Sequence, residues 1–143
     1  MRRIAQNTKV EALKRVPLFE GLSKKELTEV AAATDDLTVE AGTVLCKEGG
    51  LGSEFFVVIE GVADVTKKGR RVATRESGDF LGEIALIATT TRTATVTART
   101  PLRCLILTSR DFRRVLDDNR SVERKVLQAL AERALSYESD MAL

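Results

Sequence analysis

Hydrophobic and polar positions follow a helical period at the beginning of the chain. Over residues 8 to 34, apolar side chains recur at intervals of three until Pro17, a residue that ends or interrupts helices. Ser23 and Glu26 then have the spacing of a capping box, in which each side chain satisfies a backbone donor at the start of a helix. This first region is therefore predicted to hold helices on both sides of Pro17.

From about residue 36 to residue 108 the pattern changes to short runs rich in Val, Ile, Thr and Phe, separated by glycines. Closely spaced strands with glycine turns favour an antiparallel sandwich or barrel over a sheet built from βαβ units. Lys67–Arg70 is interpreted as a hairpin turn. The predicted strands are Leu37–Val39, Thr43–Lys47, Phe55–Glu60, Ala63–Lys67, Arg71–Thr74, Ala94–Ala98 and Leu102–Thr108.

The helical period returns over residues 109 to 138. Thr108 or Ser109 is expected to cap a first helix, which the polar run Asp117–Asn119 ends. A longer amphipathic helix follows, and its apolar face is compatible with a homodimer or a protein partner without requiring either. Its apolar positions are Val122, Val126, Leu130 and Ala134, with a second possible stripe at Leu127, Leu130, Ala134 and Tyr137. We expect residues 1–143 to form a single domain.

One segment, residues 78 to 96, interrupts the β pattern. Ile84–Ile87 is long enough for one helical turn, and Gly82 before it permits a close backbone approach or a positive φ. The free N–H groups at the start of a helical turn suit a phosphate group. Thr89–Thr91 is interpreted as a polar loop that leads back into a strand.

Three side chains of this segment suggest a ligand that joins a phosphate to a sugar. The Arg92 guanidinium can hold phosphate oxygens through two parallel hydrogen bonds, and the Thr93 hydroxyl can add a third. Glu83 would repel a phosphate, but its carboxylate can accept a hydrogen bond from a sugar hydroxyl. Plainer interpretations stay open: Glu83 as a solvated carboxylate, Gly82 as a turn residue, and Arg92 as a surface residue paired with an aspartate. The glycine-rich run Gly49–Gly52 is interpreted as a β-turn, because no Gly-Lys-Ser/Thr follows it.

Composition narrows the possible functions. The chain has 23 basic and 21 acidic side chains, a net charge of +2, which gives no electrostatic case for nucleic acid or an anionic membrane. It has no histidine, which removes histidine-based catalysis and metal sites, so we predict neither an enzyme nor a metal site. Cys46 and Cys104 lie in apolar runs and are predicted to be buried free thiols. No signal-peptide core or membrane-spanning run is found, which predicts a cytoplasmic location.

Residues 78 to 96, GDFLGEIALIATTTRTATV, resemble the phosphate-binding cassette of cyclic nucleotide-binding domains. Such domains occur in protein kinase A regulatory subunits, the bacterial catabolite activator protein and cyclic nucleotide-gated channels. Val16–Ser23 resembles the entry motif of this family, and Gly42–Gly49 and Phe55–Ala63 resemble its early strands. The resemblance covers about residues 13 to 135.

The resemblance implies a mainly β fold with flanking α-helices: an eight-stranded antiparallel jelly-roll β-barrel with N-terminal helices and two C-terminal helices. Glu83 matches the carboxylate that accepts from the ribose 2′-hydroxyl, and Arg92 matches the arginine that binds the cyclic phosphate. Gly82 and Ala85 match positions whose backbone donors contact the ribose or the phosphate, and Thr93 matches the small residue after the arginine. The predicted ligand site consists of Gly82, Glu83, Ile84, Ala85, Arg92, Thr93 and Ala94.

Two residues depart from the family pattern. Thr91 stands where many members have proline, and Gly50 stands where an acidic residue is common. Neither change removes a phosphate or ribose contact, so we expect binding to persist. Thr93 is compatible with a guanine base as well as with the phosphate, so cGMP is the alternative to cAMP, which we favour as the ligand. No cofactor beyond this ligand is expected.

We therefore expect a regulatory module that binds a cyclic nucleotide and signals by repositioning its C-terminal helices. If the last helix folds back, it would bring side chains near the base. The alternative is that Leu127 and Leu130 pack only on the barrel or on a partner subunit. The helix residues in question are Arg124, Leu127, Gln128, Ala131 and Tyr137. Other hypotheses are a degenerate domain that binds only protein, or a fragment of a larger cAMP-regulated transcription factor, channel or enzyme. Too few residues follow the long helix for a helix-turn-helix, so this chain alone is not expected to bind DNA.

Overall fold

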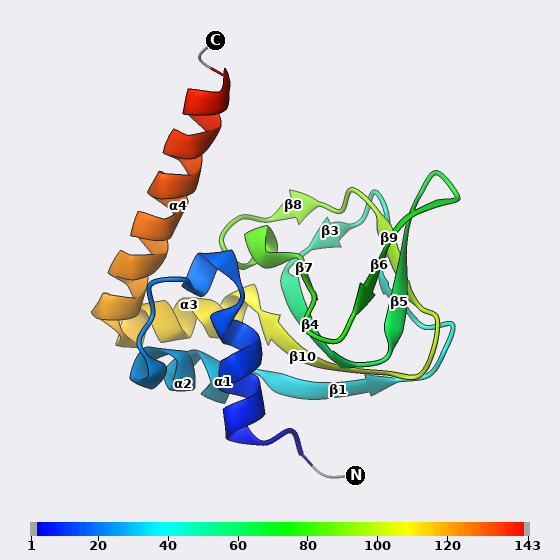
Figure 1. The fold of residues 1–143 in the computed structure, drawn as a ribbon, viewed down its shortest axis with the longest axis horizontal. Coiled ribbons are helices and arrows are strands. Elements are labelled where there is room, and N and C mark those ends of the chain that lie inside the picture. The colour runs from blue at the N-terminus through cyan, green and yellow to red at the C-terminus, as the bar shows by residue number, and fades with distance from the viewer. Residues whose placement is uncertain (1–2, 142–143) are drawn as a thin grey trace.

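The computed structural model describes the backbone of residues 3–141 and the side chains of residues 3–132, 134 and 135. Helices from both ends of the chain gather on one side of a β-roll (Figure 1). In chain order the elements are α1 Gln6–Lys14, the 3₁₀ helix η1 Pro17–Phe19, α2 Lys24–Ala32, β1 Asp35–Val39, β2 Val44–Cys46, β3 Leu51–Gly52, β4 Glu54–Glu60, β5 Val62–Lys67, β6 Arg70–Glu76, β7 Phe80–Leu81, the 3₁₀ helix η2 Glu83–Leu86, β8 Thr90–Thr91, β9 Thr95–Ala98, β10 Leu102–Thr108, α3 Ser109–Asp118 and α4 Arg120–Met141.

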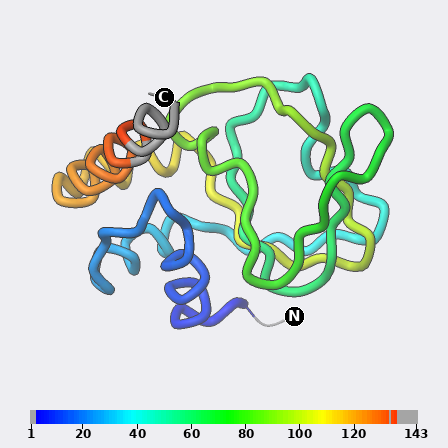
Figure 2. Tube along the Cα trace, turned by 45° about the horizontal axis from the view of Figure 1, so that its top comes forward, coloured from blue at the N-terminus to red at the C-terminus, as the bar shows by residue number. Residues whose placement is uncertain are grey.

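Two antiparallel sheets of four strands each form the roll, in the orders β1–β10–β4–β7 and β2–β9–β5–β6. A short ribbon, β3–β8, joins them at one end. The chain crosses between the sheets, so that most neighbours in a sheet, other than β5 and β6, are not consecutive in sequence, and the two sheets curve around a common interior (Figure 2). The predicted mainly β fold with flanking helices is confirmed, and the eight strands of the two sheets match the jelly-roll architecture.

Strand β4 separates two hydrophobic cores. Its successive side chains point to opposite faces, as they do in any extended strand. Phe55 and Val57 pack against the helices, whereas Phe56 and Val58 pack against the second sheet, and all four are buried. The roll thus has one core between its sheets and another beneath its helices.

Helix α2 begins where the sequence pattern predicted, directly after Ser23, whereas α1 begins at Gln6, before the predicted helical region. Ser23 and Glu26 form the capping box: the Glu26 N–H donates to Ser23 Oγ at 3.2 Å, and the Ser23 N–H donates to Glu26 Oε1 at 2.8 Å. Pro17 occupies the first position of η1, where its fixed φ and missing N–H are compatible with a helix. In the folded chain η1 contacts α4, and α2 contacts α3.

The two predicted C-terminal helices are confirmed. The Thr108 hydroxyl accepts from the Asp111 N–H at 3.1 Å and caps α3, which ends at Asp118. The first half of α4 is buried through Val122 and Val126, whereas Leu127 is 60% exposed. Figure 1 shows α4 extending away from the roll beyond this contact. The predicted stripe residue Tyr137 lies outside the side chains that the structure describes.

Three strands of two residues were not predicted. Strands β3 and β8 pair Leu51–Gly52 with Thr90–Thr91, within segments interpreted as a turn and a loop, and β7 pairs with β4. Two residues are too short for a periodic signal, so these pairs depend on contacts made across the fold. The predicted hairpin turn is confirmed, since β5 ends at Lys67 and β6 begins at Arg70.

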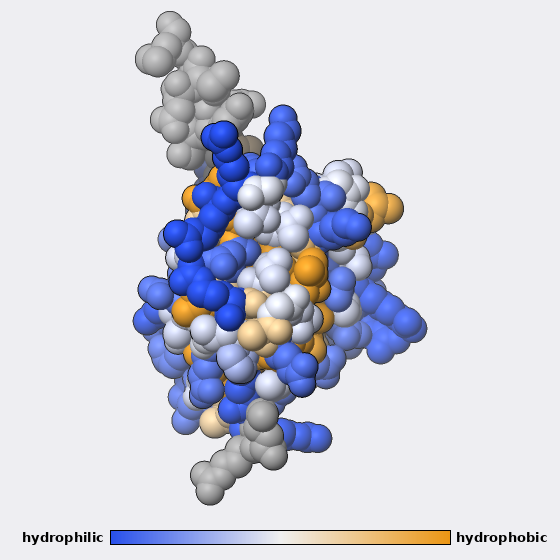
Figure 3. All heavy atoms as spheres, turned by 90° about the vertical axis from the view of Figure 1, so that its right-hand side faces the viewer, coloured by the Kyte–Doolittle hydropathy of each residue, from blue (hydrophilic) through white to orange (hydrophobic). Residues whose placement is uncertain are grey.

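The surface of the roll is largely hydrophilic on its far side from the helices, where polar side chains surround scattered apolar ones (Figure 3). Cys46 and Cys104 are free and buried, as predicted. Among residues 3–141, no helix combines the length and apolar character that a membrane span requires. Within the same part of the chain, no cluster of His, Cys, Asp or Glu is suited to a metal ion.

Candidate functional site

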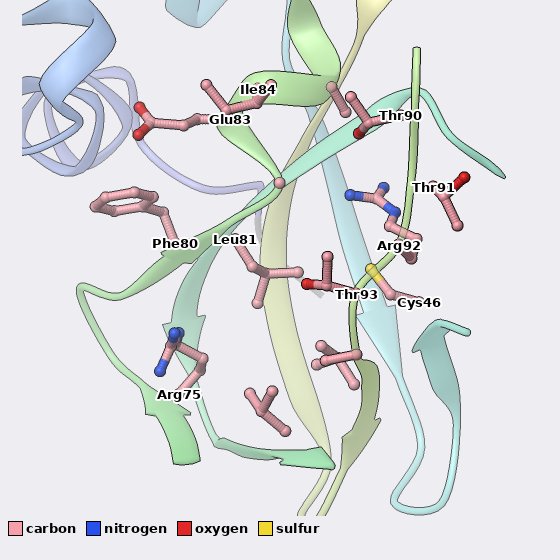
Figure 4. Close-up of a pocket in the computed structure, with 15 residues that line it drawn as sticks. Cys46, Arg75, Phe80, Leu81, Glu83, Ile84, Thr90, Thr91, Arg92 and Thr93 are labelled. Atoms are coloured by element: carbon pink, nitrogen blue, oxygen red, sulfur yellow. The ribbon is translucent and has the colours of Figure 1, made fainter. Parts of the chain in front are cut away.

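All the residues of the predicted ligand site line one pocket, with a volume of about 540 Å³. This volume lies in the range of pockets that hold small molecules. The pocket lies between the segment around η2 and the sheet that contains β5 and β9 (Figure 4). The fold thus brings together both ends of the 78 to 96 segment. The predicted residues at its lining are Gly82, Glu83, Ile84, Ala85, Arg92, Thr93 and Ala94.

Gly82 permits the turn that opens η2. Its φ of 81° lies in the left-handed region, which residues with a Cβ rarely adopt. A Cβ there would also lie 2.8 Å from the Glu54 carbonyl oxygen. The first hydrogen bond of the turn runs from the Ala85 N–H to the Gly82 carbonyl at 3.0 Å, so the N–H groups of Glu83 and Ile84 precede it. Backbone N–H groups at the start of a helical turn are the kind of donor that suits an anion.

Arg92 is held by backbone rather than by a carboxylate. Its Nη2 donates to the Glu54 carbonyl at 2.7 Å, and it is half-buried. A Cβ at Gly52 would overlap its Nε, and one at Gly82 would lie 2.5 Å from its Nη1. In the part of the chain whose side chains are described, no ion pair involves Arg92. The surface ion pair with an aspartate that the sequence left open is therefore not observed, and the guanidinium charge is available to an anion.

The glycine-rich run Gly49–Gly52 also fixes the backbone of Arg92. The Arg92 N–H donates to the Gly50 carbonyl at 2.7 Å, and the Gly49 N–H donates to the Arg92 carbonyl at 2.9 Å. This run was interpreted as a turn alone, and its function in positioning Arg92 was missed. The two segments are about 40 residues apart in sequence, and no local signal links them.

Glu83 is oriented differently from Arg92. Its side chain points away from Arg92, toward the N-terminal helical segment (Figure 4). The residue is 8% exposed, and its Oε2 accepts from the Leu18 N–H at 3.3 Å. In this conformation the carboxylate satisfies a buried backbone donor of η1, and Glu83 is also one of the residues that line the pocket.

The remaining walls include residues that sequence reasoning missed. Val65, Leu81 and Val96 make the pocket partly apolar, and the strand pattern predicted β5 and β9 but not that they would face this segment. Arg75 lines the opposite end of the pocket from Arg92 (Figure 4). Its Nη1 donates to the adjacent Thr74 carbonyl at 3.0 Å. The pocket therefore carries a guanidinium at each end and an apolar surface between them.

Cys46 lines the same pocket without the character of a nucleophile. Burial raises the pKa of its thiol, more than the nearby Arg92 charge lowers it. Burial likewise raises the pKa of Cys104 to about 12. Because the thiolate is the reactive form, both residues are inert, packed thiols at neutral pH. The site has the chemistry of a binding pocket for an anion with an apolar part.

The chain is similar in sequence to known proteins. The family model "Cyclic nucleotide-binding domain" matches residues 36–119. A cAMP-dependent protein kinase regulatory subunit from Yarrowia lipolytica is 42% identical over 106 residues, which are 73% of this chain and 28% of that protein. The chain thus spans less than a third of the length of this relative.

Solved structures agree with the fold. The N-terminal domain of a transcriptional regulator from Streptomyces coelicolor A3(2) superposes with a TM-score of 0.84 at 29% identity, covering 91% of this chain and 94% of that one. A structure described as cAMP-bound PfPKA-R superposes with a TM-score of 0.66 at 28% identity. It covers 88% of this chain and 47% of the other.

Proposed function

The chain belongs to the cyclic nucleotide-binding domain family, and from this premise we propose that it is a cAMP-binding regulatory module whose ligand occupies the pocket between η2 and β9. The observation that carries the proposal is Arg92. It is half-buried at the pocket, it is held by the Glu54 carbonyl, and no carboxylate among the described side chains neutralises it. A singly charged cyclic phosphate supplies the missing negative charge.

Each of the other site residues is assigned to one part of the ligand. The N–H groups at the start of η2 and the Arg92 guanidinium bind the phosphate oxygens, and Glu83 accepts from the ribose 2′-hydroxyl once its side chain turns to the pocket. Thr93 and Ala94 border the phosphate, and the apolar wall around Val65 receives the purine. These assignments are supported by the lining of the pocket and by the match of the 78 to 96 segment to the family pattern.

The choice of cAMP is supported by the relatives named for it, a cAMP-dependent kinase regulatory subunit and a cAMP-bound structure. cGMP is the competing ligand, since the Thr93 hydroxyl and the Arg75 guanidinium both suit the acceptors of guanine. The named relative is a regulatory subunit. We accordingly assign no catalytic function to the chain. A cytoplasmic location stays a prediction, and so does the regulation of another protein by this module.

Calorimetric titration with cAMP and with cGMP tests the proposal. We expect Arg92→Ala to weaken binding at least about thirtyfold, because charge-assisted hydrogen bonds contribute about 1.5–3 kcal/mol each. Arg70→Ala, which removes an exposed arginine at the β5–β6 turn, is the matched control and should bind as wild type does. Wild-type affinity in Arg92→Ala would contradict the site. An absence of heat for both nucleotides with the wild-type chain would favour the degenerate, protein-binding alternative.

A further inference from the structure

Glu83 connects the pocket to η1, the 3₁₀ helix Pro17–Phe19. Its Oε2 accepts from the Leu18 N–H at 3.3 Å, across 65 positions of sequence. Both ends of this hydrogen bond are shielded from water, since Glu83 is 8% exposed and Leu18 is 1% exposed. One residue thus belongs both to the ligand segment and to the packing of the N-terminal helices.

The hydrogen bond meets a specific need of η1. The first N–H groups of a helix have no partner within it, and a side chain just before the helix commonly accepts from them. The residue in that position is Val16, which makes no capping hydrogen bond, and Pro17 has no N–H. The N–H of Leu18 is therefore the first donor of η1, and Glu83 caps it from another part of the fold.

Helix η1 in turn packs against α4. Leu18 and Phe19 lie in the same buried core as Val122 and Val126, and η1 and α4 are in contact. Beyond this contact α4 extends away from the roll (Figure 1). A change in how η1 is held therefore acts at the base of α4, the helix whose position the ligand would have to alter.

We propose that Glu83 exchanges partners when the ligand binds: it caps Leu18 in the ligand-free state and turns to the ribose 2′-hydroxyl in the bound state, which releases η1 and loosens its hold on α4. The inference rests on the proposed function. Its physical basis is a competition for one carboxylate, which points away from Arg92 and accepts from the Leu18 N–H in this structure (Figure 4). A ligand shifts an equilibrium only by its different affinity for the two states, and here the 2′-hydroxyl is the group that creates the difference.

Hydrogen exchange of the Leu18 amide, followed by NMR on the whole chain, measures the exchange of partners directly. Without ligand, this buried and capped amide should exchange slowly. Saturating cAMP should accelerate it at least about tenfold, while the Leu27 amide, which donates to the Ser23 carbonyl in α2, keeps its rate. Saturating 2′-deoxy-cAMP lacks the competing hydroxyl and should leave the Leu18 rate near its ligand-free value.

Two variants distinguish the loss of the Glu83–Leu18 hydrogen bond from a general loosening of the fold. In Glu83→Ala, the Leu18 amide should exchange rapidly without ligand and no longer respond to cAMP. Glu48→Ala is the matched control, because the Glu48 carboxylate accepts from the Lys68 N–H at 3.0 Å at a distance from η1. It should accelerate the Lys68 amide and leave Leu18 unchanged. The comparison of cAMP with 2′-deoxy-cAMP uses only wild-type protein, so it tests the proposal even if a variant fails to fold.

The outcomes distinguish this inference from the proposed function. If the wild-type chain binds neither nucleotide in calorimetry, the proposed function is wrong. If it binds cAMP while the Leu18 exchange rate stays the same, the function stands and the switch is wrong. Equal acceleration by cAMP and 2′-deoxy-cAMP would overturn the ribose hydroxyl as the trigger. A wild-type Leu18 rate in Glu83→Ala would show that the carboxylate does not protect that amide.

Discussion

At the scale of single residues, the position of Arg92 depends on a residue that never touches the ligand in the proposed complex. Gly52 leaves the space that the Arg92 side chain occupies, and a Cβ there would overlap Nε and lie 2.8 Å from Cδ. The φ of Gly52 is not in the left-handed region, so the backbone itself tolerates alanine. The cost of a substitution falls on the guanidinium, which must move.

We therefore expect Gly52→Ala to fold normally and to bind cAMP about 10- to 100-fold more weakly, since the displaced guanidinium loses a charge-assisted hydrogen bond of about 1.5–3 kcal/mol. Calorimetry gives the affinity, and thermal unfolding reports the stability. The control is Gly21→Ala, where the added Cβ would lie 3.9 Å from the Lys125 Cβ, an ordinary contact. Unchanged affinity in Gly52→Ala would mean that Arg92 reaches the ligand from another conformation.

The same residues mark the limit of sequence reasoning at this scale. Arg92 and Gly82 could be proposed as anion-binding residues because their chemistry is evident within one short segment. Gly52 and Leu18 could not, because each acts through space on a residue that is distant in sequence. The hydrogen bond of Glu83 to Leu18 gave no signal in either segment. Contacts of this kind depend on the packing of the whole fold.

At the scale of elements, α2 and α4 are joined by an ion pair. Lys125 Nζ lies 2.6 Å from Glu26 Oε1, and Glu26 is also the capping-box residue of α2. The hydrogen bond from Lys125, with smaller contributions from Ser121 and the Ser23 N–H, lowers the pKa of Glu26 from 4.5 to about 2. Because the folded state holds this carboxylate ionised, its contribution to stability is complete above pH 4.5 and is lost as the pH falls toward about 2.

We expect Glu26→Gln to remove that part of the pH dependence. Glutamine keeps the capping-box acceptor, so the substitution isolates the charge. Lys125 is 38% exposed, so solvent screens the pair, and the difference in unfolding free energy between pH 7 and pH 3 should shrink by only about 1 kcal/mol. Urea unfolding at both pH values measures it, with the exposed Glu29→Gln on the same helix as control. A pH slope equal to that of wild type would assign no stability to the ion pair.

The elements also differ in how well the sequence predicts them. Helices and long strands were predicted because several residues repeat one pattern, as in the capping box of Ser23 and the alternation along β5. The two-residue strands β3 and β8 have no room for a pattern, and their pairing arises when the 49 to 52 and 90 to 92 segments meet. The missed elements are those that border the pocket, where tertiary contacts rather than periodicity determine the backbone.

At the scale of the whole molecule, the sheet that contains β4 divides the interior into a helical core and an inter-sheet core. The ligand pocket draws its apolar wall from the second, through Cys46, Val65 and Val96. The first holds an aromatic cluster, in which Phe19 lies 5.6 Å from Phe112 and 6.1 Å from Phe55, measured between ring centroids. Stability and ligand binding therefore depend mainly on different sets of side chains.

This division predicts that stability can be lowered without loss of the site. Phe112 is fully buried in the helical core, so Phe112→Ala should reduce the unfolding free energy by about 3–5 kcal/mol, and Phe112→Leu by less. A ligand that binds only the folded state stabilises it by an amount that depends on ligand concentration and Kd. If the inter-sheet core retains its shape, saturating cAMP should therefore raise the unfolding free energy of Phe112→Leu as much as that of wild type. Denaturant titration with and without cAMP measures both quantities, and a ligand effect that disappears in Phe112→Leu would show that the helical core also determines the pocket.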